Sequence, residues 1–306
     1  MIMVVRGPDE EAEVEDIKFI DTHAHYNMPA FAEDLDDVLG SIREVGVEKV
    51  ICPAVSYASN EQMLRVLGNR LEVFFALGIH PKHACPKKAT KAAPPDLAGM
   101  KRLRRWHQIR LEALDELERE VESLRPMAGA NDRVVAIGEA GLDWSLGPSE
   151  FERQVQVALF CLQIELVLDL RLPLVLHVRD AHADAVAVLR KYHGAAKGVV
   201  HCFTGSRRDA EEYLELGLHL GIGGRVTHDN REECAGLREA VSTAPADRLL
   251  LETDAPYVLP KGFGSMRNDS TAIPRIAREV ARLRGVDVAE IARATTTNAE
   301  KLFFGY

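Results

Sequence analysis

Two histidines that could bind a metal ion stand one residue apart near the start of the chain. Phe19 and Ile20 lead into Asp21, and His23 and His25 follow at alternate positions. Because side chains at positions i and i+2 of an extended strand point to the same face, the two imidazole rings are expected to project together. Two converging imidazoles can chelate a divalent cation such as zinc, manganese or iron. A single His-x-His pair is weak evidence, so the prediction depends on further ligands from other segments.

Further candidate ligands follow other short apolar stretches of the chain. Together with the histidine pair they give six residues on five stretches: His23, His25, Glu139, His177, His201 and Asp254. Any one of them has an ordinary explanation, such as an ion pair with an arginine, but six in corresponding positions favour a common site. Four histidines and two carboxylates are too many ligands for one tetrahedral ion. They are typical of two ions about 3.5–4 Å apart that share a bridging carboxylate and a bridging water.

Eight short apolar stretches precede or contain these residues, and a helical pattern follows most of them. The predicted strands cover residues 18–22, 49–55, 73–79, 133–138, 174–176, 198–200, 218–222 and 248–253. The predicted helices cover residues 31–45, 59–68, 111–124, 149–170, 183–192, 207–216, 272–284 and 288–302. Continuous Val/Ile/Leu runs are typical of strands buried on both faces, and alternation with helices indicates parallel pairing. The sequence therefore predicts an α/β fold, a TIM (β/α)8 barrel whose active site lies at the carboxyl ends of the strands.

Length, composition and charge are those of an ordinary soluble protein. The chain has 306 residues, a net charge of −9, 46% hydrophobic residues and five scattered cysteines without a Cys-x-x-Cys pair. No apolar run approaches the roughly 20 residues of a membrane span, and the amino-terminal segment lacks the apolar core of a signal peptide. These features predict a cytoplasmic protein that does not contact membranes and has neither a disulfide framework nor a zinc knuckle.

Two segments fall outside the regular alternation. Residues 1–16 read as an acidic amino-terminal extension, and residues 17–306 as a single barrel domain with a basic excursion at about 83–110. The lysines and arginines of the excursion, with Trp106, could form a nucleic-acid groove, although such a charge run is more often a solvated face. The solvated face is therefore the favoured interpretation. The acidic balance of the whole chain does not indicate general polyanion binding either.

The sequence resembles the TatD family of metal-dependent deoxyribonucleases over nearly its whole length, from about residue 19 to residue 303. The resemblance is carried in order by Asp21-Thr22-His23-Ala24-His25, Gly78-Ile79-His80-Pro81, Gly138-Glu139-Ala140-Gly141-Leu142-Asp143, Leu176-His177-Val178-Arg179, His201-Cys202-Phe203-Thr204-Gly205 and Glu252-Thr253-Asp254-Ala255-Pro256-Tyr257. It implies a dinuclear site with one ion on His23, His25 and Asp254, the other on His177 and His201, and Glu139 as the bridge. The implied reaction is hydrolysis of DNA phosphodiester bonds, commonly from the 3′ end of a single strand.

The residues themselves are compatible with such a reaction. Two divalent ions, whether Mg, Mn or Zn, would activate a shared water and clamp a phosphate oxygen, and Asp254 could be a ligand that also accepts the proton. Glu139, the bridge that the resemblance implies, would complete the catalytic pair. Candidate substrate contacts are the basic, imidazole and aromatic residues near the strand ends, namely His80, Arg179, Phe203, Tyr257 and Arg267. His80 could equally be structural, and Phe203 could equally pack in the core. The family often has Arg-Asn-Glu-Pro after the eighth strand, whereas here Arg267-Asn268 is followed by Asp269-Ser270.

Three other interpretations remain open at this point. Related barrels with His-x-His sites hydrolyse small esters or amides, and a close variant would be a D-aminoacyl-tRNA deacylase. Many dinuclear barrels bridge their ions with a carboxylated lysine on the fourth strand, whereas this chain has Glu139 there, which favours the nuclease. A barrel that binds nucleic acid or a partner without turnover is disfavoured, because such a scaffold does not need six converging ligands. The oligomeric state is not indicated by the sequence.

Overall fold

Eight parallel strands form one sheet that closes almost completely into a TIM barrel, which confirms the predicted fold class. The computed structural model describes residues 17–84, 111–112 and 114–305, so the extension at 1–16 and nearly all of the basic excursion lie outside the described residues. The strands follow one another in chain order: β1 (Phe19–Asp21), β2 (Val47–Pro53), β3 (Val73–Leu77), β4 (Val134–Asp143), β5 (Leu174–Arg179), β6 (Gly198–Val200), β7 (His219–Ile222) and β8 (Leu249–Leu251).

Helices connect the strands, and most of them bury one apolar face. They are α1 (Leu35–Glu44), α2 (Tyr57–Leu67), α4 (Leu124–Gly129), α5 (Glu150–Leu170), α6 (His182–Arg190), α7 (Arg207–Glu215), α8 (Ala235–Thr243), α9 (Ile273–Arg284) and α10 (Val288–Phe303). Short 3-10 turns include η1 (Pro29–Phe31), η2 (Pro81–His83), η3 (Gly224–Thr227) and η6 (Ser270–Ala272). In α9, for example, Ile273, Ile276 and Val280 are fully buried, and this three-to-four-residue spacing is that of one helix face.

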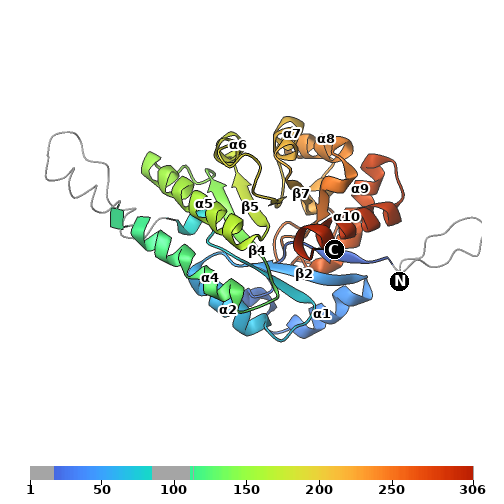
Figure 1. Cartoon of the computed structure of the whole chain (residues 1–306). Coiled ribbons are helices and arrows are strands. Elements are labelled where there is room, and N and C mark those ends of the chain that lie inside the picture. The colour runs from blue at the N-terminus through green and yellow to red at the C-terminus, as the bar shows by residue number, and fades with distance from the viewer. Residues whose placement is uncertain (1–16, 85–110, 113, 306) are drawn as a thin grey trace, which may run out of the picture. The chain divides into compact units, whose positions relative to one another are not determined.

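The chain divides into two compact units, and each is described by itself. The first unit comprises the chain up to residue 52 with residues 65–74 and 199 onwards, and the second comprises residues 53–64 and 75–198. In the first unit, α10 packs against β1 and β8. Each of the helices from α7 to α10 packs against the next one in the chain, and their colours run from yellow through orange to red in Figure 1. Backbone bonds from Thr22 N–H to Leu251 O (3.0 Å) and from Asp254 N–H to His23 O (2.8 Å) join the first strand to the last.

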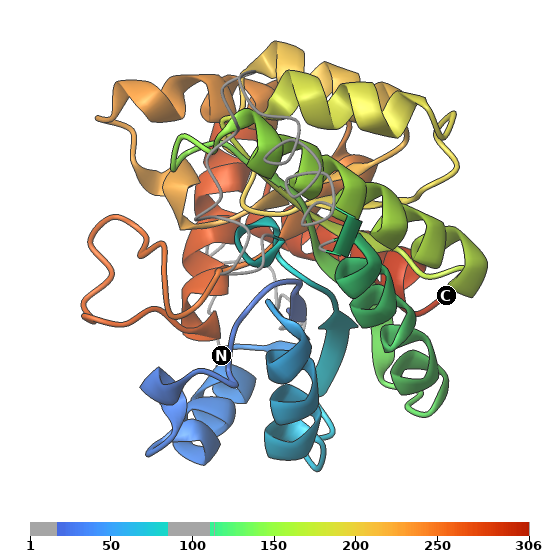
Figure 2. The same ribbon diagram turned by 90° about the vertical axis from the view of Figure 1, so that its left-hand side faces the viewer.

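The second unit is built on the pair of strands β4 and β5. Helix α5, the long light-green helix of Figure 2, packs on β4. It begins with the predicted capping box, in which Ser149 Oγ accepts from Glu152 N–H (3.3 Å) and the Glu152 carboxylate accepts from Ser149 N–H (2.8 Å). Such a cap satisfies two donors that a helix start otherwise leaves exposed.

Several elements differ from the sequence prediction by more than a residue or two at an end. Strand β4 does not end at residue 138 but continues to Asp143, and β5 continues to Arg179, because Gly141 pairs with His177 and Asp143 with Arg179. The predicted helix over 111–124 is interrupted, since residues 114–122 are helical and α4 begins at Leu124 after a turn at residue 123. Helix α8 is absent from the prediction, although its buried Leu237, Ala240 and Val241 have helical spacing.

Gly141 permits the close approach of β4 and β5 that carries His177. Its φ is +145°, and a Cβ atom there would lie 2.0 Å from the carbonyl oxygen of His177. We therefore expect Gly141→Ala to lower the free energy of unfolding by more than about 2 kcal/mol, since strain at positive φ and a backbone clash add together. Urea unfolding followed by circular dichroism measures this loss.

The matched control is Gly129→Ala in α4, where a Cβ atom meets nothing within 4 Å. That substitution should be neutral or slightly stabilising, because alanine has the higher helix propensity. Equal stability of the two variants would contradict the role given to Gly141.

Candidate metal centre

The first unit brings four of the predicted ligands together. His23 Nε2 and His25 Nε2 lie 3.3 Å apart, and the Asp254 carboxylate lies 3.7 Å from the first and 3.4 Å from the second. The ring of His201 stacks on that of His23, with centroids 3.9 Å apart and planes inclined by 7°. His23, His201 and Asp254 each offer a ligand atom within 4.8 Å of the others. Ligand atoms this close to one another could bind the same cation.

Asp21 fixes the backbone that presents these residues. Its buried carboxylate accepts four hydrogen bonds, from the N–H groups of His23 and Thr253 (3.1 Å each) and the hydroxyls of Thr253 (2.6 Å) and Ser270 (2.5 Å). Burial raises the pKa of Asp21 to about 6, against the opposing effect of these bonds. Ser270, where the sequence departs from the family pattern, thus joins β1 to the segment that follows β8, and Tyr26 Oη lies 2.7 Å from its hydroxyl.

Asp254 is a largely buried carboxylate that the structure keeps ionised. Burial acts to raise its pKa, but the hydrogen bond with His25 and the charges of His23, His25 and His201 lower the pKa below its ordinary value. The residue has a positive φ of 56°, and its own N–H donates to His23 O (2.8 Å). An ionised, oriented carboxylate beside three imidazoles suits both cation binding and proton acceptance.

The second unit holds the remaining two ligand candidates, Glu139 and His177. Glu139, only 2% exposed, has Oε2 at 3.4 Å from His177 Nδ1 and at 3.6 Å from His80 Nε2. His177 Nε2 lies 3.4 Å from the second carboxylate of the group, Asp143. His80, His177 and Asp143 each have a ligand atom within 4.8 Å of the others. His80 Nδ1 accepts from Lys82 N–H (3.0 Å), so its proton lies on the Nε2 that faces Glu139.

Two carboxylates control the protonation of His177. Although burial opposes the charged ring, Asp143 and Glu139 outweigh it and raise the pKa of His177 to about 9. In turn, the pKa of Asp143 is lowered, because its bonds with His177 and Ser145 outweigh burial. Buried imidazole nitrogens facing carboxylate oxygens form a donor set that suits divalent zinc, manganese or iron. The residues present therefore fit a divalent cation in each unit.

The predicted substrate contacts occupy different environments. Arg179 is exposed at the end of β5, and Tyr257 is 51% exposed with its ring centroid 6.3 Å from that of His25. Phe203 is 2% exposed and stands edge-on to Tyr213, which favours its packing role. The Arg267 guanidinium pairs with both carboxylate oxygens of Asp34 (2.9 and 2.6 Å) and covers the ring of Phe31. A phosphate would therefore compete with Asp34 for Arg267, whereas Arg179 and Tyr257 are accessible.

Two carboxylates near the ligands were not among the sequence candidates. Asp143 faces His177, and the fully buried Glu252 accepts from Cys202 N–H (2.6 Å) with Oε1 at 3.9 Å from His201 Nδ1. The sequence does contain a signal for each acid, since both lie at the end of an apolar stretch and within a motif of the family resemblance. The prediction took Glu139 and Asp254 as the acids of these two motifs and did not include Asp143 and Glu252.

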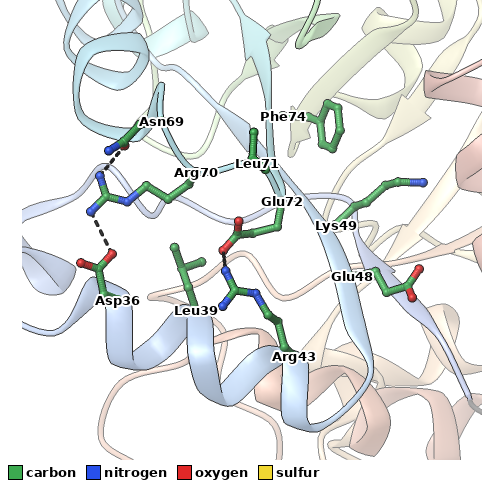
Figure 3. Close-up of a pocket in the computed structure, with 10 residues that line it drawn as sticks. All are labelled: Asp36, Leu39, Arg43, Glu48, Lys49, Asn69, Arg70, Leu71, Glu72 and Phe74. Carbon is green, nitrogen blue, oxygen red and sulfur yellow. Dashed lines mark hydrogen bonds and ion pairs between the residues drawn. The ribbon is translucent and has the colours of Figure 1, made fainter.

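A pocket of about 870 Å³ in the first unit lies away from these residues (Figure 3). It is lined by residues of α1 and by residues around the amino-terminal ends of β2 and β3: Asp36, Leu39, Arg43, Glu48, Lys49, Asn69, Arg70, Leu71, Glu72 and Phe74. Arg43 pairs with Glu72 and Arg70 with Asp36, so its charges offset one another. Barrel chemistry takes place at the opposite, carboxyl ends of the strands, so this pocket does not compete with the metal centre.

Comparison with known proteins is consistent with this chemistry. The family model described as TatD related DNase matches residues 20–304. The chain is 36% identical over 279 residues to the 3'-5' ssDNA/RNA exonuclease TatD of Erwinia amylovora, covering 89% of this chain and 95% of that protein. It is 30% identical over 286 residues to the uncharacterized metal-dependent hydrolase YabD of Bacillus subtilis, covering 92% and 98%.

A solved structure agrees with these relatives. The TatD homologue YjjV of Escherichia coli K12 superposes with a TM-score of 0.74 at 30% identity, covering 94% of this chain and 99% of that one. Among the helices of the described residues, none is long and apolar enough to cross a membrane.

The protonation of His177 gives a testable pH dependence. Its pKa in the folded protein, about 9, lies above the ordinary value of 6.5, so its stabilising contribution is complete below pH 6.5 and lost as the pH rises through 9. In protein kept metal-free with EDTA, we expect the free energy of unfolding to fall by up to about 3 kcal/mol between pH 6.5 and 9.5. Urea unfolding at several pH values measures the fall.

His177→Gln removes the titrating ring and should flatten this profile. His193→Asn, at an exposed position whose positive φ of 51° asparagine tolerates, should leave it unchanged. An equal fall in His177→Gln and in the unsubstituted protein would show that another group is responsible.

Proposed function

Because this chain belongs to the TatD-related DNase family of metal-dependent hydrolases, we propose that it is a nuclease that hydrolyses phosphodiester bonds of single-stranded DNA from the 3′ end. The observation that supports this most directly is the pair of buried His and carboxylate groups, one on His23, His25, His201 and Asp254 and one on Glu139 and His177. The exonuclease relative acts on ssDNA and RNA, which supports the substrate class.

We propose that these residues together hold two divalent ions. His23, His25 and Asp254 would hold one divalent ion, His177 and His201 the other, and Glu139 would bridge them, with Mg, Mn or Zn as the candidate ions. Bound divalent ions would neutralise developing charge on the phosphate and make a water molecule more acidic. Glu139, buried and facing the imidazoles of His80 and His177, is suited to a bridging position because both oxygens of a carboxylate can act as ligands.

The residues of the chain supply proton transfer and substrate positioning. Asp254 remains a carboxylate at neutral pH because its pKa is lowered, so it can accept a proton from the attacking water. Arg179 offers an exposed cation beyond His177 for a phosphate. Tyr257, half-exposed beside His25, offers a face on which an unpaired base can stack. The placement of a cation and an aromatic ring beside the ligands favours a nucleotide chain over a small ester or amide.

The decisive test is degradation of 5′-labelled and 3′-labelled single-stranded DNA by protein loaded with Mg, Mn or Zn, with an EDTA control. We expect metal-dependent loss of nucleotides from the 3′ end, seen as early release of the 3′ label and a ladder from the 5′ label. If protein that carries metal by elemental analysis cleaves no DNA, the nuclease proposal fails, and a small ester, an amide or a D-aminoacyl-tRNA becomes the favoured substrate.

Two substitutions test the assigned roles. Glu139→Ala should remove the bridge and with it most of the bound metal and activity. Asp254→Asn should lower turnover by about 10²–10⁴-fold, as loss of a general base and ligand would. The matched controls are Glu215→Ala and Asp247→Asn at exposed positions, which should retain full activity. Full activity in Glu139→Ala would exclude the two-ion arrangement.

A further inference from the structure

His177 presents each of its ring nitrogens to a different carboxylate. Nδ1 faces Glu139 Oε2 at 3.4 Å, and Nε2 faces Asp143 Oδ2 at 3.4 Å. A neutral imidazole carries one proton, and only the nitrogen without a proton can bind a cation. The two carboxylates are therefore not equivalent. One faces the ring nitrogen that binds the cation, and the other accepts a hydrogen bond from the nitrogen that keeps its proton.

Asp143 is held in the orientation that faces His177. Its Oδ1 accepts from both the N–H (2.9 Å) and the hydroxyl (2.5 Å) of Ser145. Its backbone N–H donates to Gln156 Oε1 (2.9 Å), and Gln156 Nε2 donates back to the Asp143 carbonyl (3.3 Å). With Oδ1 bound by Ser145 and the backbone bound by α5, the remaining oxygen, Oδ2, is directed at the imidazole.

We propose that Asp143 is a positioning residue that keeps the proton of His177 on Nε2 and so reserves Nδ1, beside Glu139, for a divalent cation, with Ser145 as the clamp that orients Asp143. A carboxylate behind a ligating histidine fixes both the tautomer and the ring orientation. The inference rests on the proposed role of His177 as a metal ligand and is independent of which substrate the enzyme cleaves.

The arrangement makes Asp143→Asn a diagnostic change. Asparagine has the shape of aspartate but only one oxygen, and the two Ser145 donors require that oxygen at the Oδ1 position. Its amide NH₂ then faces His177 Nε2, and a donor at that place favours an unprotonated Nε2 with the proton on Nδ1. The ring would thus offer the wrong nitrogen to the cation without loss of packing volume.

The experiment uses full-length protein labelled with ¹⁵N-histidine and titrated with Zn²⁺ alone. Long-range ¹H–¹⁵N spectra report the protonated nitrogen of each ring, and comparison with His177→Gln assigns the His177 signals. Zinc affinity is measured by calorimetry with a competing chelator, and circular dichroism checks folding. We expect zinc-loaded protein to show His177 bound through Nδ1 with the proton on Nε2. In Asp143→Asn, that pattern should be lost and zinc should bind about 10–100-fold more weakly.

Substitutions of Ser145, which orients Asp143, provide an independent pair of variants. Ser145→Ala should weaken zinc binding, whereas Ser145→Thr retains the hydroxyl and should restore it, so this pair decides the matter if Asp143→Asn does not fold. Asp132→Asn, at an exposed position in the same unit, is the matched control and should match the unsubstituted protein.

Each result bears separately on the two proposals. Asp143→Asn that binds zinc within twofold of the unsubstituted protein, with His177 still bound through Nδ1, would overturn the positioning role. The positioning role also fails if the His177 signals do not respond to zinc at all. Zinc binding through His177 Nδ1 in a protein that cleaves no nucleic acid would instead overturn the nuclease and leave the positioning role standing.

Discussion

The buried carboxylate of Asp21 is the interaction on which the geometry of the first unit depends. It connects β1 to Thr253 and Ser270, which lie 232 and 249 positions further along the chain. A carboxylate removed from water must be compensated by donors, and the four hydrogen bonds at Asp21 do this while its pKa stays raised. The same bonds hold the backbone of His23 beside that of Asp254. The position of the ligands in this unit is therefore a consequence of where one buried acid finds its donors.

In the second unit, the acids that must be compensated, and the histidine that compensates them, belong to the metal centre itself. Glu139 and Asp143 are two acids in a confined space, and His177 between them offsets their repulsion. A divalent cation would compensate them more strongly than one imidazolium, since it carries twice the charge and can approach the oxygens more closely. We therefore expect this cluster to be stable when His177 is protonated and more stable when a cation is bound.

Much of the barrel could be predicted because its signals are local: apolar runs mark strands, and an acid or histidine at the end of a run marks the active end. Local patterns do not reveal how far two strands stay paired. The extension of β4 to Asp143 depends on pairing with β5 and on the absence of a side chain at Gly141. The contacts of Asp143 and Glu252 with histidines were not predicted for a related reason. Whether an acid binds an ion or orients a histidine depends on which ring nitrogen it faces, and only the fold determines this.

The two positions of the proton on His177 also connect stability with metal binding. Without a cation, the raised pKa means that both nitrogens carry protons at neutral pH, and the ring bridges two acids as an imidazolium. A cation at Nδ1 has to displace one of these protons, while the other remains on Nε2 against Asp143. Cation binding and proton release at this ring are therefore linked, and affinity should weaken as the pH falls below the pKa. His177 thus stabilises the metal-free protein when it is protonated, and it must lose a proton before it can bind the metal.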